Sequence, residues 1–424
     1  MVVRWTQCAV VSALVLLMWP AVAPAVELDG TSSTYLISRK ALDDSNLLPL
    51  YEYLNMSVRD IGKESISFQF GGWLRYDLRD DSTNKNTKND LSYAYLSYRH
   101  AESNAVVNAG RVMVFEGVAA ERVDGISART DLRSGFGVSA FGGAPVETNA
   151  ADLGGNNVIY GGRVSHTMTD LYTIGLSYLK EEKNSAKFRE EEGVDLWLKP
   201  VNKVELLGKS TYNLEASGWA AHTYNLLLGP FAQVKLNTEV SKIDYEKFFV
   251  GTTNSAFMFQ PGGLIDPKEK VSIYGESVSY ELSEKLNASV DYKKYSYDIA
   301  GNAGYYGVRI SYSVPKSMAT GASIHRMSGN ADRLSYYEYR AFGMKKFGSA
   351  DVTVDLLNVK YDVAVNGVTN AYTAVLAAGY ELSEKLKLGA DLEYSKNPDY
   401  DKDVRAFLKL IYRFQSSYGK GKGV

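Results

Sequence analysis

The sequence feature that most constrains the fold is a β-hairpin with long arms, whose pattern occurs twice in this chain. Residues 271–297 read VSIYGESVSYELSEKLNASVDYKKYSY, and apolar and polar side chains alternate on both sides of the polar turn Ser283–Lys285. A period of two over about ten residues on each side of a tight turn predicts a β-hairpin. The seven residues YELSEKL return at Tyr380–Leu386, again followed by alternation. Arms of about 9–11 residues match a tilted strand that crosses a bilayer and exceed most soluble hairpins.

The first 25 residues carry the features of an export signal. Arg4 gives a positive start, Ala9–Trp19 is an apolar run too short to span a membrane as a helix, and Ala23–Ala25 fits an A-x-A cleavage site. We therefore expect residues 1–25 to be a secretory signal peptide. Cys8, the only cysteine, would leave with it, so the mature chain is expected to have no thiol and no disulfide. No later stretch is apolar for about 18 residues, so we expect a periplasmic protein, a secreted protein or an outer-membrane barrel.

Residues 26–62 show a different pattern. The segment LLPLYEYLNM (Leu47–Met56) is a compact apolar cluster that follows Asp43 and Asp44 and has Pro49 near its start. This arrangement favours a short helix or an irregular segment over a spanning strand. Two interpretations stay open. The favoured one is an N-terminal periplasmic extension packed under a barrel, and the other is a small plug inside the pore.

About twenty alternating segments follow, within residues 63–414. Their connectors alternate between short turns such as Pro315–Lys316 and longer loops such as residues 247–270. Short turns at one end, long loops at the other and an even strand count are typical of transmembrane β-barrels. We therefore predict an all-β fold, an antiparallel up-and-down β-barrel of about 20 strands with a range of about 16 to 22. Residues 415–424 are expected to form a basic C-terminal tail.

The less apolar face of the predicted strands carries charges of both signs, for example Arg75, Arg163 and Asp391. A closed apolar core could not take so many charges, because each unpaired buried charge is strongly destabilising. A water-filled lumen can hold them. Roughly 16 or more strands leave such a lumen, whereas about eight are filled by side chains. The pattern therefore predicts a channel.

The chain resembles bacterial outer-membrane porins. The residues that carry this resemblance are the signal peptide, the repeated hairpins and the final strand VRAFLKLIYRF, with Tyr412 and Phe414 where the barrel-assembly signal usually has its aromatic residues. Porins commonly stop at that phenylalanine, whereas Gln415–Val424 follow here. The resemblance implies the bacterial outer membrane, a channel for passive diffusion of small hydrophilic solutes or ions, and contact with outer-membrane lipid. It also implies a homotrimer, the state common in this class.

A second resemblance gives an alternative function. The segments YLISRKALDDSNLLPLYEYL and FGGWLRYDLRD are similar to porin-like channels of metal-reducing bacteria, some of which sheathe a multihaem cytochrome. The alternative is therefore the barrel sheath of a porin–cytochrome electron-transfer conduit, with a periplasmic multihaem cytochrome as its partner. A barrel enzyme or an adhesin is the third class.

Catalytic and cofactor signatures are mostly absent. His100, His166, His222 and His325 lie on separate predicted strands without an i,i+4 pair, which indicates wall or turn residues. No phosphate-binding G-x-x-x-x-G-K-[ST] motif occurs, and a net charge of −2 gives no reason to expect nucleic acid as a partner. We therefore expect that the protein is not an enzyme and that it binds no metal and no cofactor.

The densest run of charge marks the candidate constriction. The connector FEGVAAERVDG (Phe115–Gly125) is more apolar than a loop in solvent, so folding inward against the barrel wall would cover its apolar side chains. Opposed acids and arginines would then narrow the pore, as an inward loop does in the porins that the chain resembles, and the arginines would favour anions. The other interpretation is an external loop whose surface ion pairs contribute little. The residues predicted to line the pore are Arg75, Arg111, Glu116, Glu121, Arg122, Arg129, Asp131, Arg133 and Arg163.

Overall fold

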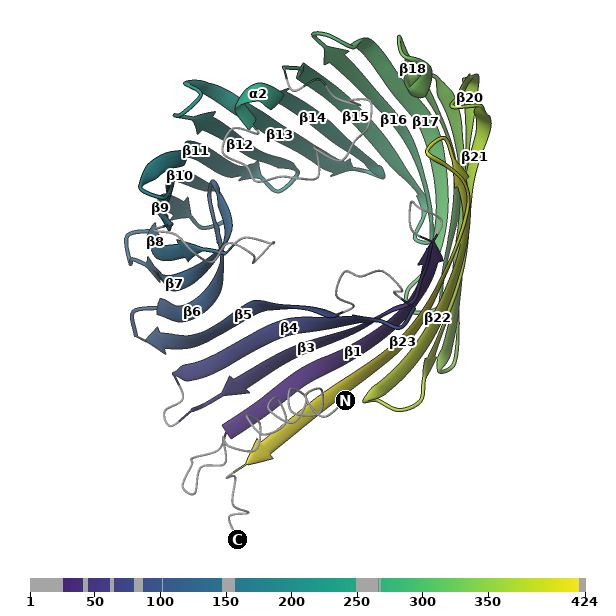
Figure 1. Ribbon diagram of the computed structural model, residues 1–424. Coiled ribbons are helices and arrows are strands. Elements are labelled where there is room, and N and C mark those ends of the chain that lie inside the picture. The colour runs from purple at the N-terminus through teal and green to yellow at the C-terminus, as the bar shows by residue number, and fades with distance from the viewer. Residues whose placement is uncertain are drawn as a thin grey trace.

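The chain forms an antiparallel β-sheet that closes on itself. The computed structural model describes residues 26–40, 45–61, 65–79, 87–100, 102–146, 157–248, 266 and 268–418. In these ranges each wall strand pairs with its neighbours in the chain. β1 (Val26–Lys40) pairs with both β3 (Pro49–Arg59) and β23 (Tyr400–Tyr418), which closes a barrel of 22 strands (Figure 1).

The other elements follow in chain order around the barrel. β2 (Asn46–Leu47) pairs with the end of β1 in the same register as β3, and α2 (Tyr245–Phe248) and η3 (Asp332–Leu334) are single turns. Among the described residues, no helix has the length and apolar character needed to cross a membrane. The remaining wall strands are β4 (Ile66–Asp77), β5 (Thr87–His100), β6 (Ala105–Glu116), β7 (Ala119–Asp131), β8 (Phe136–Pro145), β9 (Val158–Met168), β10 (Tyr172–Lys183), β11 (Ala186–Val201), β12 (Val204–Asn213), β13 (Gly218–Phe231), β14 (Val234–Asp244), β15 (Lys270–Ser283), β16 (Leu286–Tyr297), β17 (Gly301–Val314), β18 (Met318–Gly329), β19 (Tyr336–Phe347), β20 (Ala350–Val365), β21 (Val368–Glu381) and β22 (Leu386–Asn397).

The closing seam corrects the expectation for residues 26–62. β1 pairs with β23 from Val26↔Tyr418 to Ser38↔Ala406 and with β3 along its other edge. The segment is therefore neither a periplasmic extension nor a plug, because it supplies two strands of the wall. These two strands are the difference between the twenty segments predicted and the 22 observed. The last strand also includes the first four residues of the predicted tail.

The reason for the wrong assignment lies in the inward face of β3. Leu50 and Leu54 point outward, but Tyr51 and Tyr53 point inward where other strands carry charge. The Tyr53 ring lies 5.6 Å from the ring of Tyr35, centroid to centroid. Because the inward face carries tyrosines and the outward face carries Glu52 between its two leucines, the period of two is hidden, and a compact apolar run remains that is also compatible with a helix.

The outward face of the barrel is a band of apolar side chains. On β22, Leu388 and Leu392 are 41% and 50% exposed, whereas Asp391 faces inward and pairs with Lys409. Exposed apolar surface of this extent is unfavourable in water and suits the hydrocarbon of a bilayer. The same band includes Leu96, Val164, Leu176, Val240, Val290, Val308, Leu356, Leu376 and Leu408, each at least 49% exposed.

A carboxylate also lies on this outward face. The register places Glu52 on the same side of β3 as Leu50 and Leu54. The hydroxyls of Ser32 and Thr34 donate to its two carboxylate oxygens at 2.6 and 2.5 Å. These two hydrogen bonds offset part of the free energy needed to remove the charge from water.

Short turns occur at both ends of the barrel. Both YELSEKL copies make the same turn, because the Ser283 hydroxyl accepts from the backbone N–H of Leu286 at 3.2 Å and the Ser383 hydroxyl accepts from that of Leu386 at 3.1 Å. At the opposite end, the predicted loop 181–192 is largely strand, closed by a two-residue turn. The predicted signal peptide, the middle of loop 247–270 and residues 419–424 lie outside the described residues.

Candidate functional site

The end of the β6–β7 hairpin leaves the barrel wall. β6 pairs with β5 only as far as Arg111, and β7 pairs with β8 only from Val123 onward. Between these points the two strands pair with each other, around the tip Gly117–Val118. We call residues 111–124 the inner hairpin, because its contacts place it across the inside of β8 to β12 (Figure 1).

A row of glycines marks the place where the hairpin bends inward. Gly110 on β6 pairs with Gly125 on β7, which pairs with Gly143 on β8. Gly110 has a φ of +129°, a conformation that side chains disfavour. A Cβ atom at Gly110 would collide with the carbonyl oxygen of Ala94, and a Cβ atom at Gly125 with that of Gly142. The bend therefore requires glycine on adjacent strands, where the backbones approach most closely.

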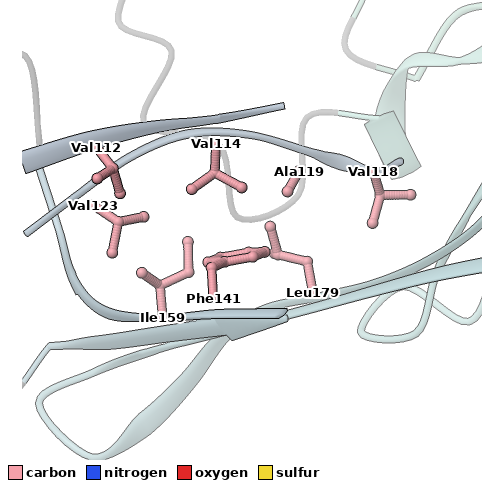
Figure 2. Close-up of a cluster of buried hydrophobic side chains, with 8 residues drawn as sticks. All are labelled: Val112, Val114, Val118, Ala119, Val123, Phe141, Ile159 and Leu179. Carbon is pink, nitrogen blue, oxygen red and sulfur yellow. The ribbon is translucent and has the colours of Figure 1, made fainter. Parts of the chain in front are cut away.

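Apolar side chains hold the inner hairpin against the wall (Figure 2). One face of the hairpin packs onto inward-pointing side chains of β8, β9 and β10, and every member is at most 6% exposed. Burying each larger aliphatic or aromatic side chain contributes about 1.5–3 kcal/mol, so the cluster stabilises the inward position substantially. Its members are Val112, Val114, Val118, Ala119 and Val123 on the hairpin and Phe141, Ile159 and Leu179 on the wall.

Polar contacts fix the tip over the more distant strands β10 to β12. The backbone N–H of Val118 donates to the Ser177 hydroxyl at 3.0 Å, and that hydroxyl donates to the carbonyl oxygen of Gly193 at 3.4 Å. The ammonium of Lys209 donates to the carbonyl oxygen of Gly117 at 2.7 Å. A Cβ atom at Gly117 would overlap Ser177, so the close approach depends on this glycine. The tip is thus hydrogen-bonded to β10 and β12.

Ion pairs with the wall involve the acidic residues predicted for this site. Arg189 on β11 donates to Glu121 at 2.6 Å and, through Nε, to Glu191 at 2.9 Å. Glu116 lies 3.7 Å from Arg129. Both predicted acids therefore lie on the wall-facing side of the inner hairpin, where arginines neutralise them.

The opposite face of the inner hairpin turns away from β8 to β12, and its arginines pair with Asp90 on β5. Arg111 donates through Nε and Nη2 to the two oxygens of Asp124, both at 2.7 Å, and its Nη1 lies 3.9 Å from Asp90 on β5. Arg122 donates to the same Asp90 carboxylate. Phe115 is 70% exposed on this face. Two arginines and two carboxylates therefore form a paired network beside an exposed ring.

Two other predicted residues lie on the inward face of the wall in tight pairs. Arg163 donates through Nε and Nη2 to the two carboxylate oxygens of Asp195 at 2.9 and 2.6 Å. This bidentate ion pair fixes the orientation of the guanidinium plane. Arg75 donates to the buried carboxylate of Asp77 at 3.1 Å. Arg163 lies beneath the inner hairpin, where its Cδ approaches Gly117.

The structure does not bring every predicted residue together. Asp131 is the last residue of β7 and accepts from Asn104 at 3.0 Å. Arg129 lies 3.7 Å from Asp131, with 56% of its side chain exposed. Arg133 lies in the turn between β7 and β8, at the barrel end that carries the chain termini. Because the Arg129 guanidinium also lies 3.7 Å from Glu116, Asp131 is linked to the inner hairpin through Arg129, whereas Arg133 stands in the turn beyond it.

Several residues of the site were missing from the predicted set. Asp90, Arg189, Asp195 and Lys209 complete the pairs of the arginines and of the hairpin tip. Alternation along β11 would have placed Arg189 and Asp195 on the inward face. The contact of Arg189 with Glu121 of the hairpin, however, joins residues 68 positions apart, and local periodicity does not predict such a contact.

Comparison with known proteins shows the fold. No family model and no curated protein matches the chain. Among solved structures, the chain is similar to the ferric enterobactin receptor (PfeA, a mutant) of Pseudomonas aeruginosa, with a TM-score of 0.58 and 9% identity over 93% of this chain and 81% of that one. It is similar to the siderophore receptor PirA of Pseudomonas aeruginosa, with a TM-score of 0.57 and 12% identity over the same shares. It is also similar to the P pilus usher (PapC) translocation pore, with a TM-score of 0.51 and 9% identity over 91% of this chain and 99% of that one. The chain thus has the fold of outer-membrane β-barrel proteins, and these neighbours are transport pores and receptors.

Proposed function

We propose that this protein is an outer-membrane porin, a water-filled channel for passive diffusion of small hydrophilic solutes or ions, narrowed by the inner hairpin. The observation that carries the proposal is the fastening of a charged hairpin to the inside of the barrel wall. A barrel of about 16 or more strands encloses a lumen that its own side chains do not fill. The inner hairpin narrows that lumen without being an independently folded domain.

The outward and inward faces of the wall support the same proposal. The outward face is apolar over most strands, as hydrocarbon requires, and the inward face holds ion pairs such as Arg163–Asp195 and Lys293–Glu239. Charged groups on the inward face remain solvated only if water fills the lumen. Ion pairs of both signs around a solvated lumen suit polar solutes.

The ion pairing alters the expected selectivity. The inner hairpin contains two arginines, Arg111 and Arg122, and three carboxylates, those of Glu116, Glu121 and Asp124. Each arginine has at least one acidic partner. Because charge is balanced locally, we propose weak ion selectivity in place of the anion preference predicted from the arginines.

The cytochrome sheath is a weaker proposal for the same barrel. A partner protein inside the lumen would have to share it with the inner hairpin, which is buried against the wall by eight apolar side chains. Displacing the hairpin would expose that cluster to water.

The experiment that tests the porin proposal measures transport by the purified barrel. In planar bilayers, the reconstituted protein is expected to give stepwise currents that scale with salt concentration. In liposomes, it is expected to give swelling rates that fall as the size of a neutral solute rises. Heat-unfolded protein is the control. A folded barrel, shown by its heat-dependent mobility on a gel, that gives neither currents nor swelling would overturn the proposal.

A further inference from the structure

A group of aromatic side chains lies on the inward face at the closing seam. Tyr35 on β1 pairs with Tyr51 on β3, and Tyr53 on β3 pairs with Trp73 on β4. Their ring centroids lie 5.6 Å apart for Tyr35 and Tyr53, 6.1 Å for Tyr51 and Trp73, and 6.5 Å for Tyr53 and Trp73. The four rings are half-buried. We call this group, with Tyr93 and Tyr95, the aromatic ribbon.

The ribbon continues onto β5. Tyr93 and Tyr95 lie with ring centroids 6.1 Å apart, and the Tyr93 hydroxyl donates to Asn55 at 3.1 Å. Gly71 on β4 faces Tyr93, and a Cβ atom at Gly71 would collide with that ring. The absence of a side chain at Gly71 therefore lets the Tyr93 ring lie across β4 and its hydroxyl reach Asn55 on β3. Aromatic surface thus extends from β1 to β5.

The ribbon is bordered by paired charges. Tyr51 is directly opposite Arg75, which pairs with Asp77. Trp73 is directly opposite Asp90, the carboxylate that accepts from Arg122 of the inner hairpin. The aromatic ribbon therefore ends at the narrowing formed by the hairpin. A solute that approaches the narrowing along this side of the wall meets flat apolar rings with hydrogen-bond donors and acceptors along their edge.

The aromatic faces and the paired charges at their border indicate which class of ligand would bind here. Aromatic faces in a wet lumen bind molecules that present a flat, weakly polar face, because the contact removes apolar surface from water. The charged groups along the border already have partners of opposite sign, so neither a cationic nor an anionic ring gains a free counter-charge. They still offer acceptor and donor capacity to hydroxyl groups. A neutral pyranose ring, with C–H groups on its face and hydroxyls around its rim, satisfies both requirements.

We propose that the aromatic ribbon is a binding track for neutral sugars, in particular short linear oligosaccharides, on the way to the constriction. The proposal rests on the porin function and names a solute class for it. Several rings in a continuous row allow successive sugar units to stack along the wall. Each unit would be held weakly enough to move on.

The test uses the full barrel in planar bilayers with maltohexaose as the probe. Maltohexaose is expected to interrupt the ion current reversibly and to saturate with concentration. Trp73→Ala and Tyr53→Ala are expected to raise the half-blocking concentration about tenfold each, which corresponds to the loss of one stacked ring. Trp73→Phe, which keeps a ring, is expected to restore most of the blockade. Tyr306→Ala, on the lipid face with 49% of Tyr306 exposed, is the control and is expected to leave blockade unchanged.

The outcomes separate this inference from the porin proposal. Normal currents without blockade by maltohexaose would overturn the sugar track and leave the porin function intact. Blockade by benzoate in place of the sugar would overturn the assignment to neutral sugars, and blockade that survives both alanine variants would overturn the location. If the barrel does not conduct, the porin proposal fails. Calorimetric titration of the detergent-solubilised barrel with maltohexaose then decides whether the aromatic ribbon binds the sugar. Heat-dependent gel mobility confirms that each variant is folded.

Discussion

Arg189 on β11 lies 2.6 Å from Glu121 of the inner hairpin, and this ion pair ties the hairpin to a wall strand 68 residues further along the chain. The guanidinium also binds Glu191, whose side chain is 8% exposed. Arg189 thus neutralises two carboxylates that would otherwise repel each other inside the barrel. Its position makes it the residue whose removal should most affect the hairpin.

Arg189→Gln is expected to loosen the inner hairpin. Removing one partner from a largely buried ion pair leaves charge without compensation and is destabilising by about 3–5 kcal/mol at full burial, and by less here because Glu121 is partly exposed. The readouts are noise in the open-channel current and the midpoint of urea unfolding in detergent. Arg340→Gln removes a half-exposed pair with Asp355 and should change stability by at most about 1 kcal/mol. Equal effects of the two variants would show that the Glu121 contact does not hold the hairpin.

Leu179→Ala is expected to weaken the apolar contact beneath the hairpin. Leu179 is 0% exposed, and truncation of a buried leucine destabilises by about 2–5 kcal/mol. Leu176, three residues earlier on the same strand, faces outward and is 62% exposed, so Leu176→Ala is the matched control and should have little effect on unfolding in detergent. A reversed order of the two unfolding midpoints would mean that the faces of β10 are wrongly assigned.

Leu388→Arg is expected to reduce the amount of folded barrel. A charge on the lipid face is destabilising by about 2–4 kcal/mol at the midplane and by less towards the interface, and Leu388 is the third residue of β22, so a smaller loss is expected. Asp391→Asn should leave the folded fraction nearly unchanged, because the Asp391–Lys409 pair lies on the inward face with part of both side chains exposed. The measurement is the fraction of heat-resistant protein on a gel. Similar losses for both variants would indicate a register shifted by one residue.

An epitope tag distinguishes the two ends of the barrel. Asn366 and Gly367 form a two-residue turn, with φ of +49° and +79°, at the end opposite to the termini. A tag inserted between them is expected to bind antibody on intact cells. A tag after Glu284, in a turn at the end that carries the termini, is expected to bind only after permeabilisation. The reverse pattern would invert the proposed orientation.

Much of the wall could be predicted from the sequence, because each of the twenty predicted segments shows its own alternation. Leu388, Asp391 and Leu392 point to the faces that the alternation assigns. The seam strands could not be predicted this way. The inward face of β3 carries Tyr51 and Tyr53 in place of charge, so the contrast between its faces is lost.

The inner hairpin was predictable only in outline. The apolar content of FEGVAAERVDG indicated that the segment needs cover, and the structure places it inside the barrel against β8 to β10. Its partners come from strands far along the chain. Contacts such as Lys209 with Gly117 and Arg189 with Glu121 depend on how closely the closed wall brings β6 to β12, which no local pattern encodes.

The most direct test of the channel and its constriction replaces residues 112–123 with the two-residue turn Asn-Gly, which joins the adjacent partners Arg111 and Asp124. Single-channel conductance is then compared with that of the unaltered barrel in the same salt solution. The unaltered protein should conduct, and the shortened protein should conduct with a larger unit step, because the segment that narrows the lumen is gone. An unaltered barrel without conductance, or a shortened barrel with an unchanged unit step, would contradict the account.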